Sequence, residues 1–270
     1  VDIFPFLKHI PAWVPGAGFQ RKAVYWKKTL GRLAEEPYQY VRRHLDHDVN
    51  ILLFCGSILK EGIPAEEAEE DIKWTATAMY IGSADTTIST VSHFLLAMLE
   101  NSHVLEKLQQ EIDTVVGRER LPDFYDRPNL PGAGLSETWQ WGVPVPINLP
   151  HHVTEDNIYR GMCIPRGSVV LLLIIVVRAI LRDESVFPNT SKFQPECFLK
   201  YTNPQAVQKM NPRNYVIGFG RRRCPGADLI DSSIWLLLVT MVATLEISKP
   251  LDTSGTIIEL KVEYNNTKFR

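Results

Sequence analysis

The sequence has few cysteines, no long apolar run and no excess of charge of either sign. Its four cysteines, Cys55, Cys163, Cys197 and Cys224, form no CxxC pair, so neither a zinc site nor a disulfide framework is expected. The longest uninterrupted apolar stretch, 169–177, is much shorter than the ~20 residues that a membrane span needs. With 29 basic and 31 acidic residues, the formal net charge is -2, which gives no electrostatic reason to expect a nucleic-acid partner.

What is present is an ordinary globular composition. The chain has 270 residues, 45% of them hydrophobic, which is enough for one large domain. Residues 1–15 are apolar and aromatic but include Asp2, Lys8 and prolines, so they predict neither a signal peptide nor a membrane anchor. Because the chain starts with Val1 instead of Met, we expect an upstream part to be missing.

Two stretches in the first hundred residues have helical patterns. Residues 20–47 combine dense charge with spaced Leu, Tyr and Val, which is typical of exposed amphipathic helices. Pro64, followed by alanines and acidic residues, predicts a second helix over 65–99, since proline suits the first turn and acids suit the positive end of the helix dipole. This helix is mostly apolar after Trp74, so we expect most of its surface to be buried.

The rest of the chain predicts shorter elements. Helices are expected at 103–116, 135–141, 178–182 and 226–244, and short strands at 152–154, 162–164 and 169–172, with turns at 160–161 and 166–167. Residues 183–216 are rich in Pro, Asn, Asp and Lys and are expected to be irregular. The predicted fold class is therefore mainly α with a small β-sheet.

The segment 217–226, Ile-Gly-Phe-Gly-Arg-Arg-Arg-Cys-Pro-Gly, carries the strongest chemical signal. Its three glycines let the backbone lie against a flat cofactor, and its three arginines supply cations that can pair with carboxylates. Cys224 stands at the entrance to the last predicted helix, where backbone N–H groups and the helix dipole stabilise a thiolate. The alternative interpretation is a glycine-rich basic turn around a buried cysteine.

This segment resembles the haem-binding loop of the cytochrome P450 family, whose pattern is Phe-x-x-Gly-x-Arg-x-Cys-x-Gly. Four positions match, and the residue at the phenylalanine position is Ile217; the matching residues are Gly220, Arg222, Cys224 and Gly226. The resemblance implies haem b as the cofactor, with Cys224 as the axial ligand of its iron and Arg222 as a partner of a propionate. A thiolate ligand favours cleavage of the O–O bond.

A second segment, 82–87, is similar to the oxygen-activation segment of the same family, Ala/Gly-Gly-x-Asp/Glu-Thr-Thr/Ser. It reads Gly-Ser-Ala-Asp-Thr-Thr, with Ser83 in place of the usual glycine. The resemblance implies that Asp85 and Thr86 deliver protons during oxygen activation. The alternative is a bend within the helix, made by Thr86 bonding to a carbonyl one turn earlier.

Two arginines of the family pattern are replaced in this chain. Residues 137–140 (Glu-Thr-Trp-Gln) align with the Glu-x-x-Arg motif, and residues 195–198 (Pro-Glu-Cys-Phe) align with the Pro-Glu-Arg-Phe motif. In the family, the glutamate and the two arginines form a buried salt-bridge triad beneath the haem. Here Gln140 and Cys197 stand at the arginine positions.

The loss of both cations constrains Glu137. A buried charge without a partner costs roughly 3–5 kcal/mol. We therefore expect Glu137 to be protonated, to be exposed as a solvated helix acid, or to pair with another cation such as Arg178 or Arg182.

His151 aligns with a position where the family often places a basic residue that faces a haem propionate. It follows Pro150, just before the first expected strand. A surface histidine, or one held by a structural hydrogen bond, is the alternative.

The resemblance covers nearly the whole chain and is nearest to fungal microsomal members. Residues 1–50 resemble mid-chain helices of the family, and residues 245–270 resemble its terminal strands. We expect residues 1–270 to form a single partial domain that lacks the amino-terminal anchor and the early helices. The full-length protein would lie on the cytoplasmic face of the endoplasmic reticulum membrane, with membrane association only through that anchor.

Three hypotheses for function follow. The first is a haem-dependent monooxygenase that takes electrons from an NADPH-dependent reductase and inserts one atom of dioxygen into an apolar organic substrate. That substrate would lie beside 81–87, with residues near 147–149 lining the pocket. The second is a catalytically impaired or inactive remnant, because Gln140 and Cys197 replace the arginines. The third, a cofactor-free helical interaction module, would require Cys224 to be dispensable.

Overall fold

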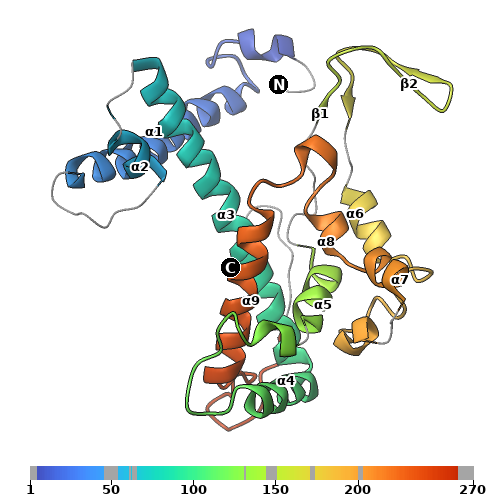
Figure 1. Cartoon of the computed structure of the whole chain (residues 1–270). Helices are drawn as coiled ribbons and strands as arrows, with labels where there is room; N and C mark the ends of the chain where they lie inside the picture. Colours follow the sequence, from blue (N-terminus) through green and yellow to red (C-terminus); the bar gives the residue numbers. More distant parts are fainter. Residues whose placement is uncertain are drawn as a thin grey trace. The chain divides into compact units, whose positions relative to one another are not determined.

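The structure is a computed structural model, and it describes residues 5–45, 54–60, 62, 66–130, 132–143, 151–170, 174–199 and 203–260. The chain divides into two compact units, residues 1–84 and 85–270. Among the described residues the structure is mainly helical, as predicted (Figure 1). The longer helices are α1 (Gly18–His44), α3 (Glu66–Glu100), α4 (Ser102–Val115), α5 (Ala133–Trp141), α6 (Ile174–Leu181) and α9 (Ala227–Thr244). The shorter ones are α2 (Phe54–Lys60), α7 (Pro204–Lys209) and α8 (Arg213–Val216).

The first unit packs α1, α2 and the first half of α3 around a small apolar cluster. Its buried members are Tyr38, Val41, Cys55, Leu59 and Ile72. Lys73 of α3 donates to Glu35 of α1 at 3.0 Å, which ties these two helices together. The amphipathic helix expected from 20–47 is confirmed as α1, and the long helix expected from 65–99 is confirmed as α3. Pro64 lies outside the described residues.

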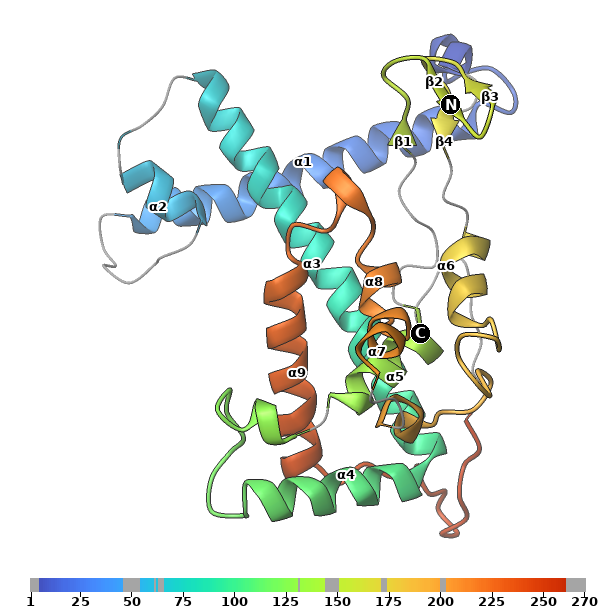
Figure 2. The same cartoon turned by 45° about the vertical axis from the view of Figure 1, so that its right-hand side comes forward.

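The second unit holds the main core. Helix α9 contributes to it along most of its length, together with the second half of α3, α4 and α5 (Figure 2). The buried side chains include Phe94, Met98, Ile112, Trp139, Ile234, Trp235 and Leu238. Helix α9 is also the one described helix long and apolar enough to cross a membrane, judged by length and composition alone. Its burial of Ile234, Trp235 and Leu238 among neighbouring helices is what a core helix requires.

The strands form two separate two-stranded antiparallel sheets instead of the single sheet that was expected. In the first sheet, β1 (His151–His152) pairs with β4 (Val169–Val170). In the second, β2 (Asn157–Tyr159) pairs with β3 (Met162–Ile164). The sequence pattern missed β2, although it found its equally short partner β3. The predicted turn at 160–161 is confirmed: Arg160 and Gly161 both have positive φ, as a two-residue hairpin turn requires.

Two further expectations were wrong, and a third is tested only in part. Helix α6 begins at Ile174 instead of near 178, and residues 171–173 lie outside the described part. The stretch 183–216 is not wholly irregular, because it contains η3 (Pro195–Leu199), α7 and α8. Helix α7 has a local cause, since the Asn203 side chain accepts from Gln205 N and proline follows the cap. Of the expected terminal strands, the residues up to 260 show a single bridge, Leu251 to Ile257.

The prediction that α3 is mostly buried after Trp74 holds for only part of the helix. Phe94, Ala97 and Met98 are buried in the core of the second unit. In contrast, Tyr80 and Ile88 are about 60% exposed (60% and 61%). The segment 82–87 also does not interrupt the helix, since α3 is continuous across it. Apolar composition predicted uniform burial here, but burial varies along the helix, since Thr86 is half-buried while Tyr80 and Ile88 are exposed.

Substitution of Gly142 by alanine should destabilise the second unit. This glycine ends α5, and an added Cβ would lie 2.5 Å from Cγ of His93 on α3. Because His93 Nδ1 donates to Ser89 O at 2.7 Å, the ring cannot swing aside freely. We expect Gly142→Ala to lower the free energy of unfolding by ~1–3 kcal/mol in urea titrations. Gly132→Ala, with no atom within 4 Å of the added Cβ, is the matched control, and an equal loss in both variants would contradict this explanation.

Candidate functional site

The cysteine loop, residues 217–226, is a closed turn between α8 and α9. Its ends meet where Cys224 N donates to Ile217 O at 2.8 Å. Gly218 has φ +85°, a backbone conformation in which a side chain is unfavourable, although an added Cβ would make only ordinary contact with Arg222 O at 3.5 Å. Gly220 also has positive φ (+56°) and begins the short helix η4 (Gly220–Arg222). The glycines that were predicted to shape this loop therefore do so through backbone conformation.

The sulfur of Cys224 lies at the approach to α9. Gly226 precedes the first residue of α9, and a Cβ at Gly226 would lie 4.0 Å from Cys224 Sγ. The glycine thus leaves space beside the sulfur. Cys224 is half-buried, whereas Ile217 at the other end of the closure is buried. The alternative of a cysteine sealed in the core is therefore wrong, and Ile217 fills the apolar position that the family pattern gives to phenylalanine.

Three consecutive cations stand on the outer side of the loop. Arg221, Arg222 and Arg223 are exposed. Within the described part of the chain, none of their guanidinium groups has a hydrogen bond or an ion pair. They are therefore available to an anionic partner from outside.

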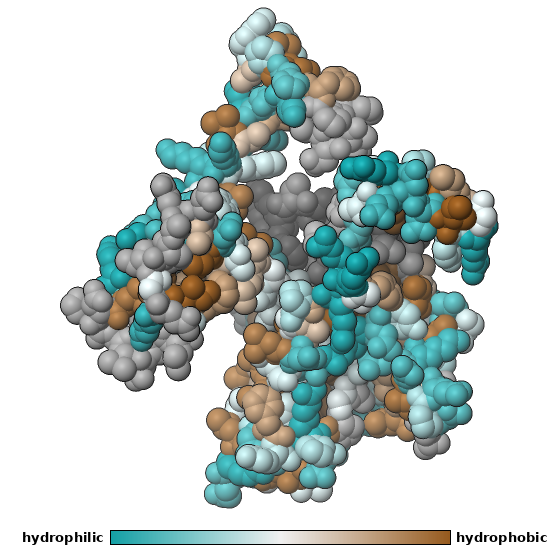
Figure 3. Space-filling model, turned by 45° about the horizontal axis from the view of Figure 1, so that its top comes forward, coloured by the Kyte–Doolittle hydropathy of each residue, from teal (hydrophilic) through white to brown (hydrophobic). Residues whose placement is uncertain are grey.

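The loop offers the groups that one face of a haem requires. It combines an accessible thiol, glycine backbone without side chains, and unpaired guanidinium groups that suit propionates. Apolar surface lies next to these groups, since Phe219 is 46% and Leu229 is 71% exposed. Figure 3 shows such brown apolar residues at the surface among teal polar ones. In the described residues no group of three His, Cys, Asp or Glu side chains could hold a metal ion, but haem iron needs only one axial ligand from this loop.

Asp85 and Thr86 lie on α3, at the start of the second unit. Asp85 is exposed and Thr86 is half-buried. The Thr86 carbonyl accepts from Thr90 Oγ1 at 2.9 Å, one turn further along the helix. Downstream, α3 and α9 share the core of the second unit through Phe94 and Trp235. In Figure 1, the second half of α3 and α9 both run downward from the candidate segments into this core.

His151 is placed in β1, paired with Val170, and it is half-buried. Among the described residues it has no hydrogen bond or ion pair with the cysteine loop. Its role toward a propionate stays a prediction. Residues 147–149, which were expected to line a substrate pocket, lie outside the described part of the chain.

Glu137 is buried, with only 2% of its surface exposed, so the expectation of a solvated acid is wrong. Its Oε1 accepts from Gln194 N at 2.8 Å, and its Oε2 accepts from Cys197 Sγ at 3.6 Å. Burial raises the pKa of Glu137 from its ordinary value of 4.5 to about 7, and the two hydrogen bonds oppose this shift only in part. Glu137, between α5 and η3, is therefore a carboxyl group that stays partly protonated at neutral pH.

The cations that might have paired with Glu137 are used elsewhere or lie outside the description. Arg182 Nη2 donates to Trp141 O at 3.3 Å, so the expected Glu137–Arg182 pair does not form. The side chain of Arg178 is outside the described set. Gln140, which is also buried, donates through Nε2 to Leu181 O at 2.5 Å. The donors to Glu137 in the described part of the chain, Gln194 N and Cys197 Sγ, are therefore neutral, which comparison with a sequence motif could not predict.

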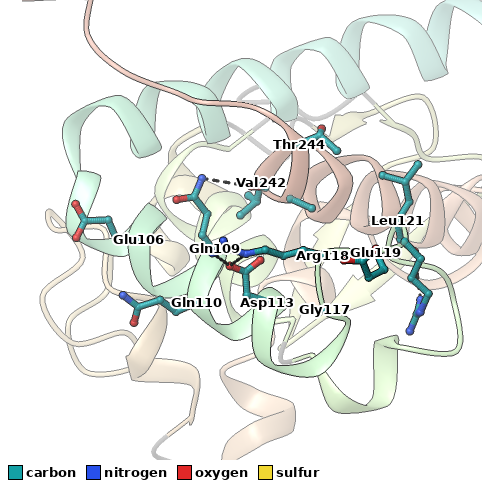
Figure 4. Close-up of a pocket in the computed structure, with 12 residues that line it drawn as sticks. Glu106, Gln109, Gln110, Asp113, Gly117, Arg118, Glu119, Leu121, Val242 and Thr244 are labelled. Carbon is teal, nitrogen blue, oxygen red and sulfur yellow. Dashed lines mark hydrogen bonds and ion pairs between the residues drawn. The ribbon is translucent and has the colours of Figure 1, made fainter.

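A polar pocket of about 720 Å³ lies away from the cysteine loop, at the opposite end of α9 (Figure 4). Its lining comes from α4, the following turn and the last residues of α9. In Figure 4, Gln109 reaches toward Val242, whose carbonyl accepts from it at 3.4 Å, and Arg118 pairs with Asp113. Since α9 rises about 1.5 Å per residue over 18 residues, this pocket and Cys224 are separated by the helix length. It is not part of the cysteine site.

Comparison with known proteins places this geometry in a family. The family model described as Cytochrome P450 matches residues 1–265. Cytochrome P450 monooxygenase 176 of Postia placenta is 39% identical over 94% of this chain and 49% of its own length. Cytochrome P450 monooxygenase claT of Ampulloclitocybe clavipes is 36% identical, over 100% of this chain and 54% of its own length. Tryptamine 4-monooxygenase of Psilocybe cyanescens is 32% identical, with the same coverage of 100% and 54%.

The chain therefore spans about half the length of these fungal relatives, which carry the names of monooxygenases. The match runs through both compact units and includes the cysteine loop and the segment 82–87. A family model that covers nearly every residue, together with a loop built to present a single thiol, leads to one conclusion. This chain belongs to the cytochrome P450 family of monooxygenases.

Proposed function

We propose that this chain binds haem b through Cys224 and forms part of an enzyme that inserts one atom of dioxygen into an apolar organic substrate. The observation that carries the proposal is the cysteine loop: a half-buried thiol, closed by the Cys224–Ile217 hydrogen bond, beside three unpaired arginines. The bound haem would supply the chemistry of oxygen activation. The match of one family model to residues 1–265 supports the further proposal that both units belong to one partial domain.

Other residues of this chain would bind the haem propionates, leave room for the ring and transfer protons. Arg222, and His151 from β1, would hold propionate carboxylates by charge-assisted hydrogen bonds. Gly220 and Gly226 would keep the backbone free of side chains where the ring must approach. The exposed carboxylate of Asp85 would exchange protons with water, and the Thr86 hydroxyl would pass them on. An apolar substrate would lie along α3, where Ile88 is 61% exposed.

Electrons would come from an NADPH-dependent reductase. The three exposed arginines next to Cys224 give a positive surface that an acidic electron donor would recognise. The proposed location is the cytoplasmic face of the endoplasmic reticulum membrane, which is supported by the kinship with fungal P450 monooxygenases. Attachment there would require an amino-terminal anchor.

A specific observation favours the alternative, a catalytically impaired member of the family. Glu137 is buried without a cationic partner among the described residues: its donors there, Gln194 N and Cys197 Sγ, are neutral, and Gln140 donates to Leu181 O instead. Breaking a buried ion pair costs about 3–5 kcal/mol when one charge is left unpaired. The neutral network limits that cost only while Glu137 keeps its proton.

One experiment separates the two candidates. The chain is loaded with haemin, reduced and exposed to carbon monoxide, and the Soret band is recorded. We expect a red-shifted thiolate band in the wild type and in Cys163→Ser, an exposed control cysteine, and its absence in Cys224→Ser. A wild-type chain that takes up no haem, or gives a blue-shifted band, supports the impaired alternative. A red-shifted band in Cys224→Ser would overturn the assignment of the ligand.

A further inference from the structure

Arg213 occupies the last helical segment before the cysteine loop, and its side chain reaches across to the helix that follows the loop. We propose that Arg213 is a positioning residue that clamps the two ends of the cysteine loop together and so fixes the sulfur of Cys224. The functional part of this inference rests on the proposed role of Cys224 as the haem ligand. The mechanical part, a loop held by Arg213, stands on the contacts alone.

The clamp is made by one guanidinium group with two hydrogen-bond acceptors and one further ion-pair partner. Arg213 lies at the start of α8, and its Nη2 donates to Asp228 Oδ1 at 2.6 Å and to Ala227 O at 3.3 Å. Its Nε forms a longer ion pair with Asp231 Oδ1, at 3.9 Å. All three partners belong to the first turns of α9, just after Cys224. Arg213 therefore joins α8 to the start of α9, the two helices that flank the cysteine loop. The Cys224–Ile217 backbone bond joins the two sides of the loop itself.

The clamp is anchored in the core of the second unit by a second arginine. Arg127, in the turn η2 (Arg127–Asn129), donates to the other oxygen of Asp231 at 2.5 Å. The same guanidinium lies over the ring of Trp235, 5.5 Å from its centroid, and Trp235 is 2% exposed. Asp231 is thus shared by two cations, one of which is stacked on a core residue. A movement of Arg213 would have to pull against this anchored carboxylate.

Burial decides which of the two acids matters. The Asp228 side chain is 94% exposed, whereas that of Asp231 is 19% exposed and that of Arg213 is 25% exposed. Exposed ion pairs contribute little because water and salt screen them, while a half-buried pair in a network keeps more of its strength. We therefore expect Asp231 to hold Arg213 in place and Asp228 to add little.

The shape of the arginine side chain is also needed. The flat guanidinium presents Nη2 to Ala227 and Asp228 and, at the same time, Nε to Asp231. The ammonium group of lysine is a compact charge on a flexible stem and cannot make both contacts at once. Nε is buried and has no hydrogen bond among the described residues, so Asp231 is its nearest charge partner. Lysine could reach one of these acceptors but not bridge them. Arg213→Lys should therefore rescue the clamp only in part.

The test uses the full 270-residue chain without haem. Hydrogen exchange reports on the Cys224 amide, which is protected only while the loop is closed onto Ile217, and a thiol reagent with mass spectrometry reports on Cys224 access. We expect Arg213→Gln and Asp231→Asn to speed up both rates about tenfold, Arg213→Lys about threefold, and Asp228→Asn hardly at all. Amides of α4 serve as an internal reference for global unfolding.

The outcomes are distinct. Equal acceleration of α4 and Cys224 amides in Arg213→Gln, or unchanged Cys224 rates in both Arg213→Gln and Asp231→Asn, would overturn the clamp. If the clamp variants loosen the loop but the wild type binds no haem in the carbon monoxide test, the clamp stands and the proposed function falls. If haem binds with a thiolate band, Arg213→Gln should increase the blue-shifted fraction while Asp228→Asn should not, which a general loss of stability would not produce.

Discussion

The free energy of unfolding of this chain is expected to fall by about 3 kcal/mol between pH 4.5 and pH 7 through the titration of Glu137 alone. The pKa of this glutamate is raised by burial from 4.5 to about 7 in the folded state. The folded state therefore binds the proton more tightly than the unfolded state. The stabilisation is fully present below pH 4.5 and is lost as pH rises through about 7, after which no further loss is expected.

The measurement is a set of urea titrations at several pH values, for the wild type and for Glu137→Gln. Glutamine is a neutral isostere that can accept from Gln194 N and donate to Cys197 Sγ. The difference between the two pH profiles isolates Glu137, because every other titrating group is common to both. Glu119→Gln, an exposed control, should follow the wild type. Parallel profiles for wild type and Glu137→Gln would show that burial does not control this carboxyl.

A second acid titrates in a different window and so does not interfere. Arg120 donates two hydrogen bonds to Asp126, at 2.7 Å and 2.5 Å, and lowers the pKa of Asp126 from 3.8 to about 2. The contribution of Asp126 to the free energy of unfolding is present above pH 3.8 and is lost as pH falls through about 2. The two acids therefore act in opposite directions. Burial also raises the pKa of Glu111, but this acid is common to the wild type and Glu137→Gln, so the difference between their profiles reports on Glu137.

Substitution of Cys197 by arginine is expected to have the second large effect. The sulfur lies 3.6 Å from Glu137 Oε2, so a guanidinium at this position can reach the carboxylate. At pH 8, where the wild type carries a buried unpaired charge, we expect Cys197→Arg to raise the free energy of unfolding by about 3 kcal/mol. At pH 5 the gain should be much smaller, because the wild type keeps Glu137 protonated there and so carries no unpaired buried charge.

Gln140→Arg should behave differently on its own. The glutamine Nε2 already donates to Leu181 O at 2.5 Å in a buried position, and an arginine must break that bond. We expect a loss of stability for this single substitution, and better haem retention than the wild type only when it is combined with Cys197→Arg. Retention is measured as the rate of haem transfer to an apoglobin, with Cys163→Arg, at an exposed cysteine, as the matched control. No change in the double variant would mean that the missing arginines do not limit haem binding.

The sequence was sufficient for features that depend on neighbours along the chain. The cysteine loop is an example, because positive φ at Gly218 and Gly220 and the start of α9 after Gly226 follow from residue types within ten positions. The start of the long helix α3 is another, because acidic residues there favour a helix, whereas the expected interruption at 82–87 is absent.

Only the tertiary structure decided which side chains are buried and which distant groups meet. Glutamate is a residue type that usually lies at the surface, yet Glu137 is buried because α5 packs against η3. Its donor Gln194, which precedes η3, lies 57 residues further along the chain. Arg127 and Asp231, 104 residues apart, are joined only because η2 and α9 pack against each other. Local patterns fix backbone conformation through short-range sterics, whereas burial, pKa and ion pairing depend on what the rest of the chain places nearby.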